Sequence, residues 1–96
     1  MARIVWSNEA RQDLDAIFFR LNSESLSYSQ KWINEIFNKI ELLEKFPNMG
    51  RKVPEIKINS IREIFAGRYR VIYNICKDGT VEIMAIRHLS QPLSEF

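Results

Sequence analysis

Apolar residues recur along the first half of the chain at spacings of three and four, the period of an amphipathic helix. One stripe predicts a helix over about residues 8–21, with Ser7 as its N-cap, and a polar break at 22–25 separates it from a longer helix that ends before Pro47. We expect two helices joined by so short a connection to pack as an antiparallel hairpin. The stripes consist of Ala10, Leu14, Ile17, Phe18 and Leu21, and of Trp32, Ile33, Ile36, Ile40 and Leu43.

Segments rich in β-branched and aromatic residues predict strands on both sides of the helical hairpin. They cover residues 2–6, 61–65, 69–76 and 80–88. Each helix presents an apolar stripe that must be covered, so we expect the strands to form one sheet against the helices. The predicted fold class is α+β: an N-terminal strand, an antiparallel helical hairpin and then a three-stranded antiparallel meander, all within a single domain over residues 1–96.

The hairpin between the last two strands admits two registers, and they differ in which residues share a face with Arg70. Alternation along its strand places Arg70 on the side away from the helices, which we expect to be the more polar side. With a three-residue loop ending at Gly79, Arg70 lies opposite Ile86 and shares its face with His88. With a two-residue loop ending there, Arg70 lies opposite Arg87 and His88 turns toward the helices. Both turns suit the sequence.

Composition and charge limit the cellular compartments and the classes of partner that we expect for this chain. Of the 96 residues 46% are hydrophobic, yet no apolar run approaches the roughly 20 residues of a membrane span. With no secretory segment and a single cysteine, we expect a cytoplasmic protein. The formal net charge is +2, and residues 51–88 carry eight Lys and Arg against four Asp and Glu. That excess is compatible with an acidic partner, and equally with a solvated surface that has no ligand.

Several kinds of chemistry find no support in the sequence. One histidine, one cysteine and carboxylates without ligand-like spacing predict no metal site. Gly50, Gly67 and Gly79 are isolated, so no phosphate-binding glycine loop is present and we expect no cofactor. No serine occupies a strand-to-helix elbow of the kind that exposes a nucleophile.

The basic half does contain the side chains that metal-free RNA cleavage requires. This reaction uses the ribose 2′-hydroxyl as its nucleophile, so the protein needs a base, an acid and cations around the phosphate. Glu55 is the candidate base, His88 the candidate titratable group near neutral pH, and Arg70 and Arg62 the candidate phosphate ligands. The plainer interpretation is that His88 is an ordinary strand-end residue and that Glu55 pairs with a neighbouring cation.

Five short segments stand in a characteristic order along nearly the whole chain. They are Ile4-Val5-Trp6-Ser7 with Ala10 and Asp13-Leu14, then Gly50-Arg51-Lys52-Val53-Pro54-Glu55, Arg62-Glu63-Ile64, Tyr69-Arg70-Val71-Ile72-Tyr73 and Ile86-Arg87-His88. Together they resemble the RelE/ParE superfamily of toxins from bacterial type II toxin–antitoxin systems. The fold of this superfamily agrees with the one predicted from the hydrophobic pattern.

The resemblance implies one of two targets. RelE-like and YoeB-like toxins cut mRNA on the ribosome, and Glu55, Arg70 and His88 are similar to the base, phosphate ligand and acid of YoeB-like members. ParE-like toxins inhibit DNA gyrase. YoeB-like nucleases use a C-terminal tyrosine near the scissile phosphate, whereas in this chain Leu89 follows His88. Ribosome-dependent mRNA cleavage is our first expectation, gyrase inhibition the alternative, and an inactive homologue that only binds an antitoxin the third. Expected contacts to RNA or another target are Arg51, Lys52, Lys57, Arg68 and Arg87.

Either target implies a cognate antitoxin as a protein partner. Such a segment could bind by docking a helix into an apolar groove or by pairing its charges with the basic sheet. Most apolar residues of the helices must be ordinary core. Phe19 and Trp32 are the two whose exposure would indicate a docking surface.

Overall fold

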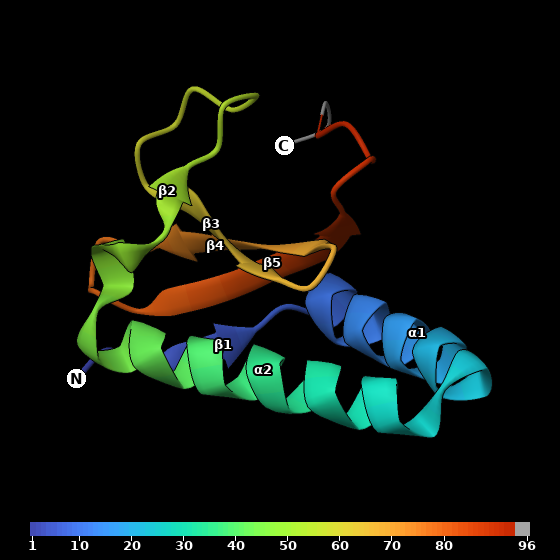
Figure 1. Ribbon diagram of the computed structural model, residues 1–96. Coiled ribbons are helices and arrows are strands. Elements are labelled where there is room, and N and C mark those ends of the chain that lie inside the picture. Colours follow the sequence, from blue (N-terminus) through green and yellow to red (C-terminus); the bar gives the residue numbers. More distant parts are fainter. Residues whose placement is uncertain (94–96) are drawn as a thin grey trace.

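The computed structural model describes residues 1–93, and the predicted α+β fold class is confirmed (Figure 1). A single turn of 3₁₀ helix, η1, and a two-residue strand, β2, were not predicted from the sequence. The elements are β1 (Ile4–Trp6), α1 (Asn8–Glu24), α2 (Leu26–Lys45), η1 (Pro47–Met49), β2 (Arg51–Lys52), β3 (Ile61–Ala66), β4 (Tyr69–Ile75) and β5 (Val81–His88).

The helical hairpin turns at one residue, Ser25, and not over the predicted break at residues 22–25. The Ser25 N–H donates to the Leu21 carbonyl at 2.8 Å and ends α1, while its hydroxyl accepts from the Tyr28 N–H at 3.2 Å and starts α2. The helix continues through the predicted break because the hydroxyl of the buried Ser29 donates to the Asn22 side chain at 3.0 Å. The first helix therefore ends three residues later than its apolar stripe indicated.

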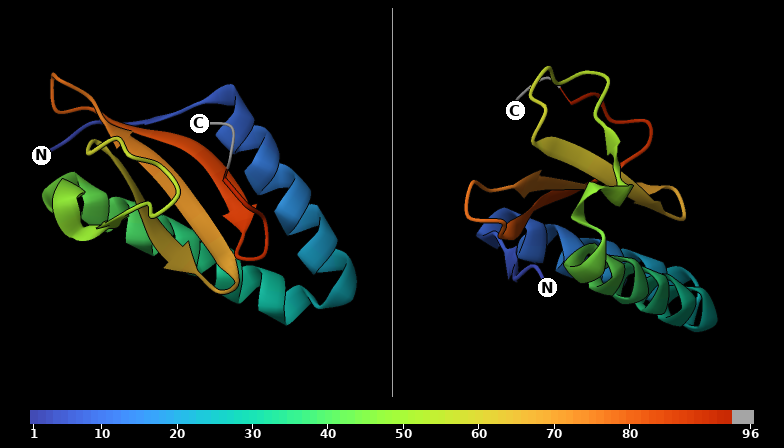
Figure 2. Two further views of the ribbon diagram at one scale, coloured as in Figure 1. Left: turned by 90° about the horizontal axis from the view of Figure 1, so that it is seen from above. Right: turned by 90° about the vertical axis from the view of Figure 1, so that its left-hand side faces the viewer.

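All five strands of the described chain form one sheet in the order β1-β5-β4-β3-β2. β1 runs parallel to β5, and every other neighbouring pair is antiparallel. Both helices lie against one face of the sheet, while the loop over residues 53–60 and the segment after β5 lie on the opposite side, which we call the outer face (Figures 1 and 2). The sheet is thus covered on both sides.

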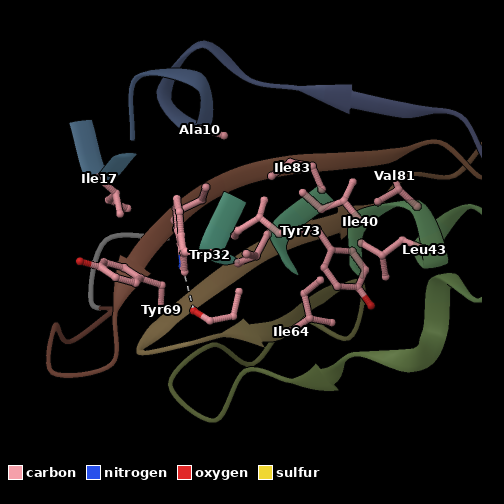
Figure 3. Packing of buried hydrophobic residues seen from close by; sticks show 14 of the residues in the cluster. Ala10, Ile17, Trp32, Ile40, Leu43, Ile64, Tyr69, Tyr73, Val81 and Ile83 are labelled. Atoms are coloured by element: carbon pink, nitrogen blue, oxygen red, sulfur yellow. Dashed lines mark hydrogen bonds between the residues drawn. The ribbon is translucent and has the colours of Figure 1, made fainter. Parts of the chain in front are cut away.

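The main core lies between the helices and the sheet (Figure 3). Trp32 stands at its centre with 1% of its surface exposed, and its indole N–H donates to the Ala66 carbonyl at 3.1 Å. Trp32 therefore belongs to the core and gives no sign of a docking surface, because this side chain fills the space between α2 and β3. Phe19 on α1 is 78% exposed, so of the two side chains only Phe19 shows the exposure that would indicate a docking surface.

The outer face is less polar than predicted, because it carries a second apolar cluster. Ile61 and Ile72 from the sheet pack there against Val53 and Ile56 from the loop, and against Leu93 from the short tail after β5. The loop and the tail are thus held onto the sheet by burial of apolar side chains.

The hairpin between β4 and β5 combines features of both registers considered from the sequence. Its loop has three residues, since the Cys76 N–H donates to the Thr80 carbonyl at 2.8 Å and Gly79 has a φ of 89°. At the far end, however, Arg70 pairs with Arg87, as the two-residue loop predicted. An irregularity between the two ends reconciles these observations.

That irregularity is a one-residue shift at Met84, a β-bulge in β5. Two side chains near the start of α1 hold it in place: the Ser7 hydroxyl donates to the Met84 carbonyl at 2.9 Å, and Asp13 accepts from the Ile86 N–H at 2.9 Å. They provide hydrogen-bond partners for the backbone groups of β5 that extend beyond the end of β1. As a consequence His88 lies on the helix side of the sheet.

Candidate functional site

A row of four charged side chains crosses the outer face of the sheet, and we call it the outer-face network. Arg51 Nε lies 2.6 Å from one carboxylate oxygen of Glu63, and Arg70 Nε lies 2.5 Å from the other. The two terminal nitrogens of Arg70 then meet the two oxygens of Glu55 at 2.7 and 2.8 Å. Cross-strand register brings the first three together, and the loop over 53–60 supplies the fourth. The structure thus joins Arg70 and Glu55, two of the predicted catalytic residues.

Glu55 is poorly suited to act as a general base in this arrangement. The hydrogen bonds from Arg70 lower its pKa from 4.5 to about 2. Each of its oxygens also accepts a hydrogen bond from Arg70, which directs the carboxylate at the guanidinium. A base near neutral pH needs a higher pKa and a free lone pair directed at the proton it removes.

Arg70 is equally occupied. All three of its guanidinium nitrogens donate to carboxylates, and only 5% of the residue is exposed. Glu63 beneath it is 1% exposed, so the two buried charges depend on each other for compensation. A phosphate could approach Arg70 only by displacing Glu55 from its bidentate pair.

His88 lies on the opposite side of the sheet from the outer-face network. It pairs across the strands with Tyr69, and the two rings meet edge to face with centroids 5.3 Å apart. Tyr69 belongs to the core beneath the helices (Figure 3). The structure therefore does not bring His88 together with Arg70 and Glu55.

Arg62, the second candidate phosphate ligand, also points to the helix side. Its Nη1 donates to the Gly50 carbonyl at 2.8 Å, next to η1, and its Nε is buried without a partner among the described residues. Its cross-strand neighbour is the buried Tyr73, whose hydroxyl donates to the Pro47 carbonyl at 2.6 Å. Arg62 therefore links β3 to the segment before β2 through this hydrogen bond.

The five residues expected to contact RNA or another target do not form one surface. Arg51 pairs with Glu63 and stacks on the Phe65 ring at 5.1 Å, at the β2 edge of the sheet. Arg87, in β5 near the other edge, binds Asp13 at 2.5 Å and also pairs with Glu9. The remaining three are exposed, in β2, in the outer loop and in the β3–β4 turn respectively: Lys52, Lys57 and Arg68.

Two residues that organise these arginines were not singled out as site residues. Glu63 links Arg51 to Arg70, and Asp13 binds both Arg87 and the edge of β5. A carboxylate between the apolar residues Ile61 and Phe65, on the same face of β3, is a signal for Glu63. Asp13 carries no comparable local signal, because its partners lie more than seventy residues away in the chain.

Neither a metal centre nor a membrane span is found within residues 1–93. No group of three or more His, Cys, Asp or Glu side chains in this part of the chain is arranged to hold a metal ion. No helix in the same range is long and apolar enough to cross a bilayer.

Comparison with known proteins extends over almost the whole chain. In solved structures, it is similar to a chain of the chromosomal ParDE toxin–antitoxin system from P. aeruginosa, with a TM-score of 0.73, 20% identity and coverage of 92% of this chain and 96% of that one. A chain of the RelBE2 toxin–antitoxin complex from Mycobacterium tuberculosis gives a TM-score of 0.57, 19% identity and coverage of 91% and 96%.

At these identities the two structures establish the fold alone. No curated protein matches the sequence. The family described as "ParE toxin of type II toxin-antitoxin system, parDE" matches residues 4–93. The chain therefore belongs to the ParE toxin family of type II toxin–antitoxin systems.

Proposed function

We propose that this toxin arrests growth by binding its target, not by cutting RNA, and that the target is DNA gyrase. Gyrase is the target that the resemblance to ParE-like members implies. The observation that carries the proposal is the closed pairing of Arg70 with Glu55 and Glu63, which leaves neither a free base nor a free phosphate ligand. Ribosome-dependent mRNA cleavage becomes the second candidate, because the fold does bring Arg70 and Glu55 together, although cleavage would require RNA to displace Glu55 from this pair.

The partner that restrains the toxin is, in this proposal, a cognate antitoxin. Its docking surface is on the helical hairpin, where six large apolar side chains are exposed although they belong to a folded helical layer. An amphipathic helix could cover several of them at once. They are Phe19 at 78%, Leu26 at 64%, Tyr28 at 42%, Phe37 at 49%, Leu42 at 45% and Phe46 at 58% exposure.

The decisive experiment is to induce the toxin in cells without antitoxin and follow two early readouts. Plasmid supercoiling reports on gyrase, and incorporation of labelled amino acids reports on translation. We expect supercoiling to fall and DNA cleavage complexes to form while incorporation continues. Rapid arrest of incorporation with unchanged supercoiling would overturn the gyrase proposal and favour mRNA cleavage.

A matched variant separates the two candidates at the level of the residues. Glu55→Gln removes the candidate base but leaves the buried part of the outer-face network, so the chain should still fold. We expect this variant to remain toxic and to inhibit purified gyrase like the parent. Loss of toxicity in a folded Glu55→Gln protein would argue for a nuclease. Absence of both effects in the parent would favour the third reading, an inactive homologue.

A further inference from the structure

A cleft runs beside α1 where β4 begins and β5 ends, outside the outer-face network. It consists of two adjoining hollows of about 590 and 550 Å³ that share Arg20, Tyr69 and His88. Ser90 and Gln91 border the first hollow, and the second is bordered by Tyr28 and Arg68. We call the combined depression the His88 cleft.

Three arginines line this cleft, and two of them, Arg20 and Arg68, have unused hydrogen-bonding capacity. Arg20 donates to the Tyr69 hydroxyl and lies over that ring with its Cζ 5.7 Å from the centroid, but it has no carboxylate partner within residues 1–93. Arg68 is exposed in the turn between β3 and β4 and likewise pairs with no carboxylate in that range. This contrasts with Arg51, Arg70 and Arg87, which are all paired.

His88 adds an oriented donor. Its Nδ1 accepts the Ser90 N–H at 3.1 Å and lies 2.8 Å from the Ser90 hydroxyl, so the neutral ring carries its proton on Nε2. The edge contact with the Tyr69 ring fixes the plane of the imidazole. Among the described residues Nε2 has no partner, so this N–H remains available to a ligand.

We propose that the His88 cleft binds a carboxylate side chain of an acidic, partly apolar protein segment. Arg20, Arg68 and His88 supply directed donors of the type that makes charge-assisted hydrogen bonds with carboxylates. The walls also include the buried apolar side chains of Ile17 and Leu21, which suit an apolar neighbour of the acid.

The surroundings favour an acidic peptide over a nucleic acid. A phosphodiester backbone carries a charge at every nucleotide and is bound by a continuous run of cations. Here Glu24 and Asp13 lie on the borders of the cleft and interrupt its positive charge, so the cations suit one carboxylate and not the repeated charges of such a backbone. The exposed cations Arg51 and Lys52 lie in β2, at the far edge of the sheet, and do not extend the site.

The test is a nuclear magnetic resonance titration of the full ¹⁵N-labelled chain with a capped peptide that alternates Glu and Leu. Probes for comparison are the same peptide with Gln for Glu and a single-stranded oligothymidylate. We expect the Glu peptide to shift the signals of Arg20, Arg68 and His88 and to bind about tenfold more tightly than the Gln peptide. Arg20→Gln and Arg68→Gln should each weaken binding by about the same factor. Arg11→Gln, on an exposed part of α1 outside the cleft, is the matched control and should bind like the parent.

Three results would overturn the proposal: equal affinity for the Glu and Gln peptides, shifts that map outside the cleft, or tighter binding of oligothymidylate with the same arginine dependence. The inference does not rest on the choice of gyrase as target. If the parent chain inhibits gyrase but does not bind the peptide, the cleft proposal alone is refuted. If it binds the peptide but does not inhibit gyrase, the gyrase proposal alone is refuted.

Discussion

The outer-face network and the His88 cleft use the same kinds of side chain in opposite ways. In the network, two arginines and two glutamates satisfy one another, and the central pair, Arg70 and Glu63, is buried. In the cleft, Arg20, Arg68 and His88 have few partners and remain accessible from solvent. The network holds a loop onto the sheet, whereas the cleft has donors left for a ligand.

This difference shows why residue type alone is a poor guide to a site. An arginine and a glutamate within reach of each other resemble a catalytic pair in a sequence, but their contact holds both in the ionised form and uses their hydrogen-bonding positions on each other. The informative quantity is the number of hydrogen-bonding positions that remain unfilled after folding. By that measure the histidine side of the sheet is better prepared for binding than the arginine-rich outer face.

The largest effect should follow from breaking the network at its centre. Arg70→Met leaves the buried Glu63 with only the exposed Arg51 as partner, so we expect a loss of about 3 kcal/mol in the free energy of unfolding. Urea denaturation measures it. The double variant Arg70→Met, Glu63→Met should lose less than the single one, because no charge is left buried. A single variant as stable as the parent would mean that the network is not structural.

A smaller loss should come from the backbone that positions Arg51. A Cβ at Gly50 would lie 2.5 Å from the hydroxyl of the buried Tyr73 and 2.7 Å from the Glu63 carbonyl. Gly50→Ala should therefore cost about 2 kcal/mol through displacement of β2. The control is Gly79→Ala, which meets nothing within 4 Å and costs only the strain of a positive φ, about 1 kcal/mol. Equal losses in thermal denaturation would contradict the packing argument.

The outer end of the network predicts a dependence of stability on pH. The pKa of Glu55 is about 2 in the folded chain and near 4.5 when unperturbed, so the folded state favours the ionised form. This contribution is complete above about pH 4.5 and is lost as the pH falls toward 2. We expect about 1 kcal/mol, since the side chain is 37% exposed. Unfolding measured across this range should be less pH-dependent in Glu55→Gln, and identical profiles would contradict the prediction.

The smallest effect on stability should come from the cleft. Arg68→Gln removes a cation without an internal carboxylate partner, so the free energy of unfolding should change by no more than about 0.5 kcal/mol. Chemical denaturation of this variant beside Arg70→Met measures the contrast directly. A loss above about 1 kcal/mol would mean that Arg68 supports the fold and that the two regions differ less than proposed.

The elements of this fold could be predicted because their signals are local. Helical periodicity identified α1 and α2, and alternation placed Arg70 on the face away from the helices, as the structure confirms. The two-residue strand β2 was missed, because so short an element has no periodicity of its own. The end of α1 was placed too early, since the Ser29 hydrogen bond that keeps Asn22 in the helix comes from the next helix.

The composition of the site was harder to predict because it depends on contacts between distant residues. The residues before Gly79 suited both a three-residue and a two-residue loop, and they could not reveal the bulge that Ser7 and Asp13 stabilise from the other end of the chain. Likewise, the sequence suggested Glu55 as a base and gave no sign that Arg70 would occupy both of its oxygens.

The bulge at Met84 also affects how this chain can be compared with its relatives. A straight β5 with the same number of residues would turn His88 to the face that carries Arg70. Two toxins with a histidine in the same alignment column can therefore hold it in different chemical surroundings. A residue's role can be transferred between members of the family only when the strand geometry matches as well as the residue type. A single bulge residue is enough to move every side chain after it to the other face of the sheet.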